Sequence, residues 1–246
     1  MNVCAVIPTY ENERTIEDVV RAVRAHVPAV IVVDDGSGNA ARTASERIAA
    51  AGMAHVVFRD QNGGKGAAVK TGLEHAHRLG YTHALQIDAD GQHDVADVPK
   101  LLEASRREPT ALVLGQPVFD ESAPSARRMG RLVSVFWCAV ETGSRKIGDP
   151  LCGYRVYPVE AALAVRARGD AMDFDPEIAV RLAWAGHPIV HVQTKVRYLS
   201  RDEGGVSHYR TLRDTLLISW MHTRLCTRGL LLLLGWRPRA ALARGP

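Results

Sequence analysis

The first half of the chain alternates between two hydrophobic patterns. Short apolar runs are typical of buried strands, and each is followed by a segment whose apolar residues recur every three or four positions, as on one face of a helix. Ile16, Val19 and Val23 form such a stripe. The pattern predicts strands at 3–7, 29–33, 56–58, 83–87 and 111–115, and helices at 15–25, 40–51, 66–78 and 95–106.

Strands that alternate with helices predict an α/β fold, in which a mostly parallel sheet carries helices on both faces. Right-handed crossover connections place the carboxyl ends of parallel strands at the same edge of the sheet. Open sheets of this kind bind their ligands at that edge. We therefore expect functional side chains directly after the predicted strands.

The second half has a less regular pattern. No segment has the composition of a linker, so we expect a single domain that ends near residue 210, followed by an amphipathic extension over 211–246. The pattern predicts loops at 117–124 and 149–155, helices at 126–145 and 176–185, a strand at 189–198 and a lid-like polar segment at 201–208.

A polar cluster follows each of the first four predicted strands. Convergence of four separate segments on one sheet edge indicates a site more strongly than any single motif does. The clusters are Pro8-Thr9-Tyr10-Glu11, Asp34-Asp35-Gly36-Ser37, Gly63-Gly64-Lys65-Gly66 and Asp88-Ala89-Asp90-Gly91-Gln92.

Asp88 and Asp90 are the strongest candidates for chemistry. Residues two apart in extended backbone point the same way, so both carboxylates can bind one hard cation such as Mg²⁺ or Mn²⁺. Such an ion acts as a Lewis acid on a leaving diphosphate. Gln92 could add a ligand or an outer hydrogen bond. A turn followed by a helix cap uses the same residue types without any metal.

The second and third clusters suit a nucleotide. Asp34 and Asp35 can accept hydrogen bonds from a base or ribose, and Tyr10 can stack on a base. Glycines beside Lys65 permit close backbone approach, and Lys65 brings positive charge to a diphosphate. The spacing differs from GxxxxGK[ST], which disfavours a P-loop ATPase. For each of these residues a purely structural role, in a turn or in packing at the sheet edge, is the alternative.

Further candidates lie in the second half. A general base would take a proton from a hydroxyl acceptor, whereas a phosphate acceptor needs none. The candidate bases, which the sequence does not rank, are Asp149, Asp173, Asp175 and Glu177. The arginines that could bind phosphate or sugar oxygens are Arg127, Arg128, Arg155 and Arg201.

Bulk composition narrows the class of protein. The 246 residues are 46% hydrophobic and 24% charged, as in a globular protein. A net charge of +4 suits an anionic substrate or membrane surface and does not require nucleic acid. The four cysteines are widely spaced and form no CxxC pair, so we expect free thiols in a reducing compartment. A start without a charged leader predicts a cytoplasmic protein.

The C-terminal extension has an amphipathic pattern. Leu212, Leu216 and Trp220 alternate with Arg213 and other polar residues, and an apolar run over 229–236 follows. That run is far shorter than the roughly 20 residues that span a bilayer. An interfacial helix at the inner face of the cytoplasmic membrane is one interpretation, and a helix packed on the core or on a partner protein is the other.

The motifs PTYENE, VVDDGS, GGKGAAVKTGL, QIDADGQHD, GDPLCGYRVY and FDPEIAVRLAWAG span about residues 1–210. In this order they resemble glycosyltransferase family 2, which has the Rossmann-like GT-A fold, and most of all its dolichol-phosphate and polyprenyl-phosphate mannosyltransferases. The resemblance implies a nucleotide-sugar donor half over 1–115 and an acceptor half over 116–210. Similar bacterial proteins accompany acyltransferases, which makes an acyltransferase an expected partner.

The resemblance also implies roles for individual residues. The residues that would contact the nucleoside are Pro8, Tyr10 and Asp35. The metal and diphosphate would be bound by Asp88, Ala89, Asp90 and Gln92. Arg128 would lie near the sugar or phosphate, and a DPxxGxR-like element of the family is matched by Asp149 and Arg155.

The sequence thus predicts a metal-dependent, inverting glycosyltransferase. It would move a hexose from a UDP- or GDP-linked donor to a lipid or polyprenyl-phosphate acceptor. A sugar nucleotidylyltransferase shares the α/β core, but its N-terminal glycine loop is missing here. A dinucleotide-dependent oxidoreductase lacks its GxGxxG after the first strand. A non-catalytic nucleotide-binding partner of an acyltransferase is the remaining alternative.

Overall fold

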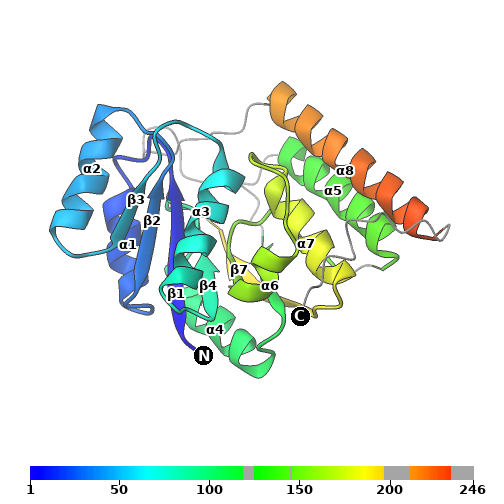
Figure 1. The fold of residues 1–246 in the computed structure, drawn as a ribbon, viewed down its shortest axis with the longest axis horizontal. Coiled ribbons are helices and arrows are strands. Elements are labelled where there is room, and N and C mark those ends of the chain that lie inside the picture. The colour runs from blue at the N-terminus through cyan, green and yellow to red at the C-terminus, as the bar shows by residue number, and fades with distance from the viewer. Residues whose placement is uncertain (119–124, 145, 197–210, 234–246) are drawn as a thin grey trace.

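The computed structural model describes residues 1–118, 125–144, 146–196 and 211–233, with the backbone alone for 125–130, 211 and 231–233. Over these residues seven strands form one sheet in the order β3-β2-β1-β4-β6-β5-β7 (Figure 1). All run parallel except β6, which is antiparallel to its neighbours β4 and β5. The predicted α/β class with a mostly parallel sheet is therefore confirmed.

The strands are β1 (Val3–Thr9), β2 (Val30–Asp34), β3 (His55–Phe58), β4 (His83–Gln86), β5 (Leu112–Val118), β6 (Arg155–Pro158) and β7 (Ile189–Lys195). The helices are α1 (Ile16–Arg24), α2 (Asn39–Ala50), α3 (Lys65–Arg78), α4 (Val98–Arg107), α5 (Ser125–Thr142), α6 (Val159–Ala164), α7 (Phe174–Trp184) and α8 (Thr211–Leu233), and a 3₁₀ turn, Val95–Asp97, precedes α4.

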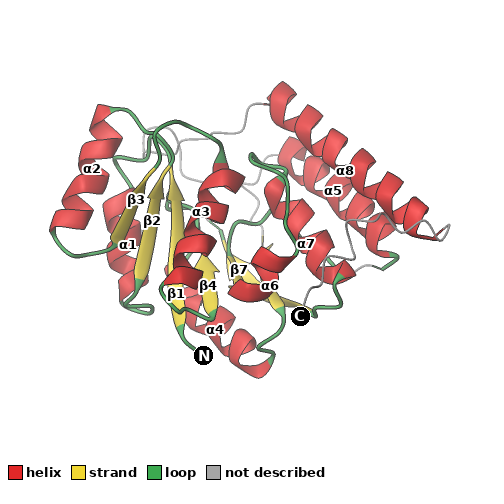
Figure 2. Cartoon of the chain, viewed as in Figure 1, coloured by secondary structure: helices red, strands yellow, loops and turns green. Residues whose placement is uncertain are grey.

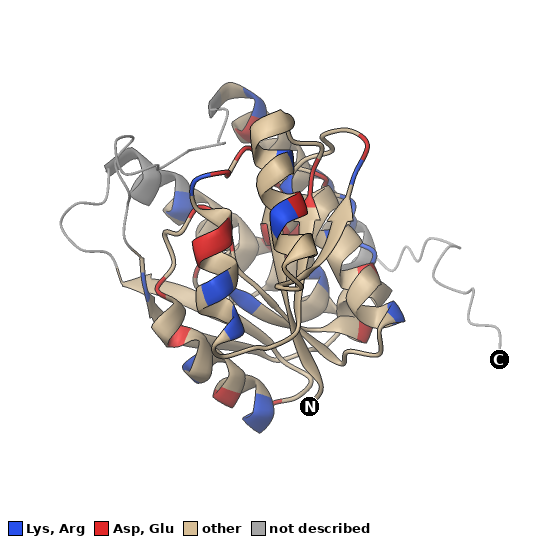
Figure 3. Cartoon of the chain, turned by 90° about the vertical axis from the view of Figure 1, so that its left-hand side faces the viewer, with Lys and Arg blue, Asp and Glu red and all other residues tan. Residues whose placement is uncertain are grey.

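Two apolar layers sandwich the sheet (Figure 2). Side chains alternate along β1, so Cys4 and Val6 pack in a cluster with α3, α6 and α7. Ala5 and Ile7 point the other way, into a cluster with α1, α2 and α4. Charged residues lie mainly on the helices and loops, while most of the strand ribbon is uncharged (Figure 3). Helices on both faces leave the sheet edge at the carboxyl ends of the strands for ligands.

Two glycines let α3 approach its neighbours closely. A Cβ on Gly72 would lie 2.3 Å from Cγ1 of Val6 in β1, and one on Gly66 would lie 2.4 Å from Cβ of Phe174 in α7. Only glycine fits at such distances. The first residue of α3, Lys65, is thereby held between the central strands and the start of α7.

α5 and α8 lie side by side at the end of the molecule away from α2 (Figure 1). Ile218, Met221 and Leu225 of α8 are buried in the same cluster as α3 and α7. The helical part of the C-terminal extension is thus packed on the core through one face. Over the described residues no helix combines the length and hydrophobicity that crossing a bilayer requires.

The second half differs from its sequence prediction in several elements. β6 and α6 were not predicted, and the helix predicted at 95–106 begins as a 3₁₀ turn. Pro117 and Val118 belong to β5 rather than to a loop. The remainder of the predicted loop, 119–124, and the predicted lid at 201–208 lie outside the described residues.

Candidate active site

The four polar clusters lie together at the carboxyl edge of the parallel strands. Glu11, after β1, accepts a hydrogen bond from the Gly38 amide at 2.7 Å, after β2. Asp35 accepts hydrogen bonds from the Gly63 and Gly64 amides at 3.1 and 2.7 Å. Direct contacts thus join each cluster to the next, and the contact between Lys65 and Asp88 joins the last two clusters.

Lys65 lies at the centre of the site. Its Nζ is 2.9 Å from both carboxylate oxygens of Asp88 and 2.9 Å from Oδ2 of Asp175. Burial alone would lower the pKa of Lys65, but the two carboxylates outweigh it and raise that pKa above its ordinary range. The ammonium therefore stays charged and joins the ends of β4, α3 and α7.

A buried arginine, Arg155, holds Asp175, the second carboxylate that contacts Lys65. Nη1 of Arg155 donates to the Asp175 carbonyl at 3.0 Å and lies 3.7 Å from its carboxylate. The same guanidinium donates to the carbonyls of Pro150 and Cys152. Arg155 is fully buried, so in this arrangement it braces the 149–155 loop and does not face a ligand.

Gly153 in that loop packs directly against the ion pair. A Cβ at this position would lie 2.3 Å and 2.5 Å from the oxygens of Asp88 and 2.5 Å from Nζ of Lys65. A side chain at this position would require the carboxylate of Asp88 and the ammonium of Lys65 to move from their present positions. The glycine is part of the DPLCGYR motif, and its role was not foreseen because the contact spans 65 residues of sequence.

Asp88 and Asp90 lie in a turn rather than in extended backbone. β4 ends at Gln86, and Gly91 follows the acidic pair with φ +71°. Oδ1 of Asp90 accepts the Gln92 amide at 3.0 Å. Strand alternation therefore does not set the directions of the two carboxylates, although they are near enough for the charge of Asp88 to influence Asp90.

The two carboxylates of this turn differ in charge environment. Burial acts to raise the pKa of Asp88, but Lys65 and His93 more than offset it and hold that pKa below its ordinary range. His93 Nε2 lies 3.8 Å from Asp88. Burial, and then the negative charge of Asp88, raise the pKa of Asp90. The site thus carries acidic charge that a further cation would neutralise.

The residues predicted to contact a nucleoside divide into two groups. Tyr10 is partly exposed at the end of β1, whereas Pro8 is buried within that strand. Asp35 is buried and, besides the glycine amides, pairs with Arg59 at 2.9 Å. Burial is the main cause that raises the pKa of Asp35. In this structure Asp35 holds the glycine loop, a function that the sequence did not indicate.

Asp34 and Ala89 are the remaining candidate residues at the carboxyl edge of the sheet. Oδ1 of Asp34 accepts the Ser37 amide at 2.9 Å, and its Oδ2 is buried without a hydrogen-bond partner among the described residues. The carbonyl of Ala89 accepts the Thr15 hydroxyl at 2.6 Å, which ties the acidic turn to the start of α1. The Thr15–Ala89 contact sets the position of the acidic turn relative to α1.

The candidate bases all have protein partners. Asp149 pairs with Arg131 and accepts the Leu151 amide at 3.0 Å. Asp173 accepts the Ala171 amide at 3.1 Å, and burial raises its pKa. Glu177 is fully buried and pairs with Arg181 at 2.6 Å and Arg224 at 2.7 Å. Asp175 holds Lys65, as described above.

Three of the candidate arginines fall outside this description. The side chains of Arg127 and Arg128 and the whole of Arg201 lie outside the described residues. Arg59 and Arg131 were not among the candidates, yet both pair with acidic site residues. Arginines are common on surfaces, so sequence spacing alone could not separate these two from the rest.

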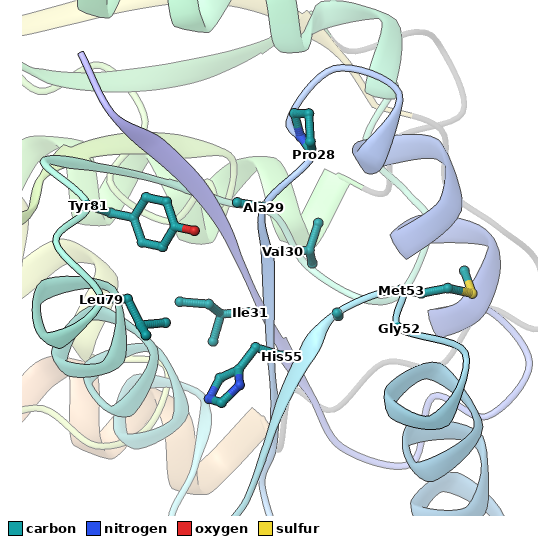
Figure 4. A pocket seen from close by; sticks show the side chains of 10 residues that line it. Pro28, Ala29, Val30, Ile31, Gly52, Met53, His55, Leu79 and Tyr81 are labelled. Carbon is teal, nitrogen blue, oxygen red and sulfur yellow. The ribbon is translucent and has the colours of Figure 1, made fainter.

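A shallow hollow of about 200 Å³ lies away from this site (Figure 4). It is formed at the amino ends of β2 and β3 together with Leu79 and Tyr81 after α3. Its lining is mostly apolar, and it is on the sheet edge opposite the acidic turn. Nothing in it matches the chemistry of a phosphorylated ligand.

Comparisons with known proteins agree with this fold and site. Solved structures of glucosyl-3-phosphoglycerate synthase from Mycobacterium tuberculosis share the fold; the one solved with Mn²⁺ and UDP-glucose has a TM-score of 0.64 at 20% identity, over 97% of this chain and 80% of that one. The fold is thus that of the GT-A glycosyltransferases. The sequence profile of Glycosyl transferase family 2 matches residues 4–157, and the chain belongs to that family.

Three relatives show which glycosyltransferases this chain resembles in sequence. The chain is 29% identical to glycosyltransferase AglJ of Haloferax volcanii over 86% of this chain and 68% of that protein. It is also 29% identical to the undecaprenyl-phosphate mannosyltransferase of Micrococcus luteus, over 83% and 86%. A polyprenol monophosphomannose synthase of Mycolicibacterium smegmatis matches at 34% over 40% of this chain and 39% of that protein. The chain is therefore a glycosyltransferase, as the motifs predicted.

Replacing Gly153 with alanine tests the tight contact at the ion pair. The added Cβ should push Asp88 away from Lys65, and a misplacement of about 1 Å in a catalytic group can cost about 100-fold in rate. We expect glycosyl transfer to fall by about that factor in Gly153→Ala while circular dichroism shows an intact fold.

The matched control is Gly229→Ala in α8, where a Cβ would lie 3.8 Å from Trp184, an ordinary contact distance. We expect this variant to keep wild-type activity. Full activity in Gly153→Ala would show that the ion pair tolerates displacement and would contradict the assignment.

Proposed function

We propose that the chain is an inverting, divalent-metal-dependent hexosyltransferase that uses a UDP- or GDP-linked sugar and a polyprenyl-phosphate acceptor. The observation that carries this proposal is the Lys65–Asp88 ion pair beside Asp90 at the carboxyl edge of the parallel strands. It combines a positive charge for a diphosphate with two oxygen-donor side chains for a cation. The other features below support the same reaction.

The donor set fits Mg²⁺ or Mn²⁺. Carboxylate oxygens are the ligands that these hard cations prefer, and Asp88 and Asp90 offer them from one turn, with Gln92 next to them. Asp88 already binds a cation, because the Lys65 ammonium lies 2.9 Å from both of its oxygens. A bound metal would neutralise charge on the leaving diphosphate.

The state of the candidate bases favours a phosphate acceptor. Asp149, Asp175 and Glu177 are each paired with a cationic side chain, which makes them poor proton acceptors in this structure. Of the four candidates only Asp173, which accepts a backbone amide, has no ion pair among the described residues. A phosphate oxygen is already anionic and needs no proton removed. The names of two relatives, an undecaprenyl-phosphate mannosyltransferase and a polyprenol monophosphomannose synthase, agree with such an acceptor.

The reaction then needs little from the protein besides positioning and charge. An acceptor phosphate oxygen attacks C1 of the hexose from the side opposite the diphosphate and forms the new C1–O bond. The bond from C1 to the diphosphate breaks, and its electron pair stays on the diphosphate. Lys65, held by Asp175, supplies positive charge to that departing group. Tyr10 and Asp34, at the ends of β1 and β2, lie on the nucleoside side.

A ligand-stabilisation series tests the donor and the metal together. We expect UDP or GDP to raise the melting temperature only when Mn²⁺ or Mg²⁺ is present, since a ligand at about 100 times its Kd adds about 2.7 kcal/mol of stability. Asp90→Asn should abolish this shift, because it removes a metal ligand. Asp18→Asn, on the exposed face of α1, is the control and should keep the shift.

The same samples separate the proposal from its rivals. Incubation with the stabilising donor and a polyprenyl phosphate should release the nucleoside diphosphate and invert the anomeric configuration, as seen by NMR. Release of pyrophosphate would indicate a nucleotidylyltransferase instead. A donor that stays intact throughout would favour a non-catalytic partner, to which the predicted acyltransferase association would then belong.

The outer faces of α5 and α8 support a peripheral membrane location, which we include in the proposal. Both helices expose large apolar side chains, and exposed Arg213 and Arg228 accompany them on α8. Apolar residues with Trp and basic neighbours suit the surface of an anionic bilayer, where a lipid-linked acceptor resides. This apolar face consists of Leu132, Val133, Phe136, Trp137 and Val140 on α5 and Leu212, Leu216, Trp220 and Leu230 on α8.

Sedimentation with vesicles that contain phosphatidylglycerol tests this face. Trp220→Asp should weaken vesicle binding by at least about tenfold, because one large apolar side chain contributes about 1.5–3 kcal/mol on burial. Leu79→Asp, at an exposed apolar residue outside the face, should bind like wild type. Equal binding by both variants, or a stable dimer in light scattering, would show that lipid is not the occupant.

A further inference from the structure

A second group of potential metal ligands lies far along the chain from the acidic turn, between α5 and α8. Cys138, Glu141 and His222 each offer one ligand atom, and these atoms lie within 4.8 Å of one another. All three residues are buried. Cys226 extends the group, because its Sγ is 3.8 Å from Oε1 of Glu141.

The spacing of these residues suits a site between two helices. Cys138 and Glu141 are three residues apart on α5, and His222 and Cys226 are four apart on α8. Residues three or four apart lie on the same face of a helix, so each helix presents two ligands to the other. Metal sites in helical bundles are built from such pairs on facing helices.

The hydrogen bonds within the cluster leave two buried atoms unused. Nδ1 of His222 lies 2.8 Å from Oε1 of Glu141, which satisfies one atom of each side chain. Oε2 of Glu141 and Nε2 of His222 are shielded from solvent without a hydrogen-bond partner among the described residues. The ring nitrogen of His222 that faces Glu141 is Nδ1, so a metal ion shared by the two side chains would be held by Nδ1 in place of this hydrogen bond. Such an ion would also give the unpaired Oε2 of Glu141 a partner, and a buried polar atom without one is unfavourable.

We propose that Cys138, Glu141 and His222, with Cys226 as a fourth ligand, form a structural zinc site that clamps α8 to α5. Thiolate and imidazole ligands suit Zn²⁺, whereas the oxygen-only turn of Asp88 and Asp90 suits Mg²⁺ or Mn²⁺. Binding would displace the two thiol protons to solvent and leave the histidine neutral. The two metals are thus distinguished by ligand chemistry.

The geometry requires a modest contraction. Zinc bonds of about 2.0–2.3 Å place neighbouring ligand atoms about 3.3–3.8 Å apart in a tetrahedral site. The ligand atoms of Cys138, Glu141 and His222 lie within 4.8 Å of one another, and Sγ of Cys226 is 3.8 Å from Oε1 of Glu141. Side-chain rotation can supply the difference of about 1 Å, since Cys, Glu and His each have staggered alternatives.

The site would matter for the apolar face that α5 and α8 carry. Trp137 of that face stacks on His222, with the ring centres 6.4 Å apart. A zinc ion held by His222 would therefore fix both the helix pair and an exposed aromatic residue. Loss of zinc should loosen α8 before it affects the sheet.

Metal content and cobalt substitution test the proposal on the full-length, untagged wild-type chain. We expect about one zinc per chain after dialysis against a weak chelator, and Co²⁺ in its place should give a thiolate-to-cobalt absorption band. A strong chelator should lower the melting temperature and increase amide exchange in α8 first. Absence of both zinc and the thiolate band from folded wild-type protein would overturn the proposal.

Variants then assign the ligands. Cys226→Ser, at a partly exposed position, should fold, bind zinc more weakly and shift the cobalt spectrum. His222→Gln should lose zinc. Cys4→Ser, another buried thiol but in β1, should retain zinc and the cobalt band unchanged. Equal zinc content and spectra in all three variants would contradict the ligand assignment whether or not the glycosyltransferase reaction proceeds as proposed.

Discussion

The ion pair between Lys65 and Asp88 is the interaction on which the site depends. Lys65 also pairs with Asp175, and the three residues come from separate segments: the start of α3, the turn after β4 and the start of α7. Buried charges are stable only when they are paired and hydrogen-bonded, and here the Arg155 guanidinium completes the balance. Removing one partner would leave a charge uncompensated, so these segments hold one another in register.

This interaction also explains why the two halves of the chain form one site. Asp88 belongs to the parallel part of the sheet, whereas Asp175, Arg155 and Gly153 belong to the part of the chain that follows β5. The antiparallel strand β6 lies between β4 and β5, and it brings the 149–155 loop to the acidic turn. The two halves of the chain are thereby joined through side chains in contact.

Hydrophobic periodicity predicted the strands and helices whose apolar pattern is distinct. The runs that form β1 to β5 are bounded by Gly, Pro or Asp, and the helices that follow them have nine or more residues. β6 has four residues and begins with a charged one, Arg155, whose burial depends on carbonyls and on Asp175. α6 has six residues, which is under two helical turns. β3 and β4 are as short as β6 and were predicted, so the charged first residue of β6, and not its length, explains why it was missed. The short length of α6 left no helical pattern to detect.

The same limit applies to the site. Parallel-strand topology predicted which clusters would meet, because strand ends share an edge. It could not predict which carboxylates are engaged elsewhere, because that depends on partners distant in sequence: Glu177 pairs with Arg224, and Asp35 with the amides of Gly63 and Gly64. Residue type indicates the chemistry available, and tertiary contacts decide which groups remain free for a ligand.

The most direct test of the account is the affinity of the donor-free enzyme for Mn²⁺, measured by electron paramagnetic resonance in wild type and in Lys65→Met. If Asp88 alternates between the Lys65 ammonium and a divalent cation, removing the ammonium should tighten Mn²⁺ binding, and adding Asp88→Asn should abolish the gain. Unchanged or weaker Mn²⁺ binding in Lys65→Met would contradict a shared carboxylate at the centre of the site.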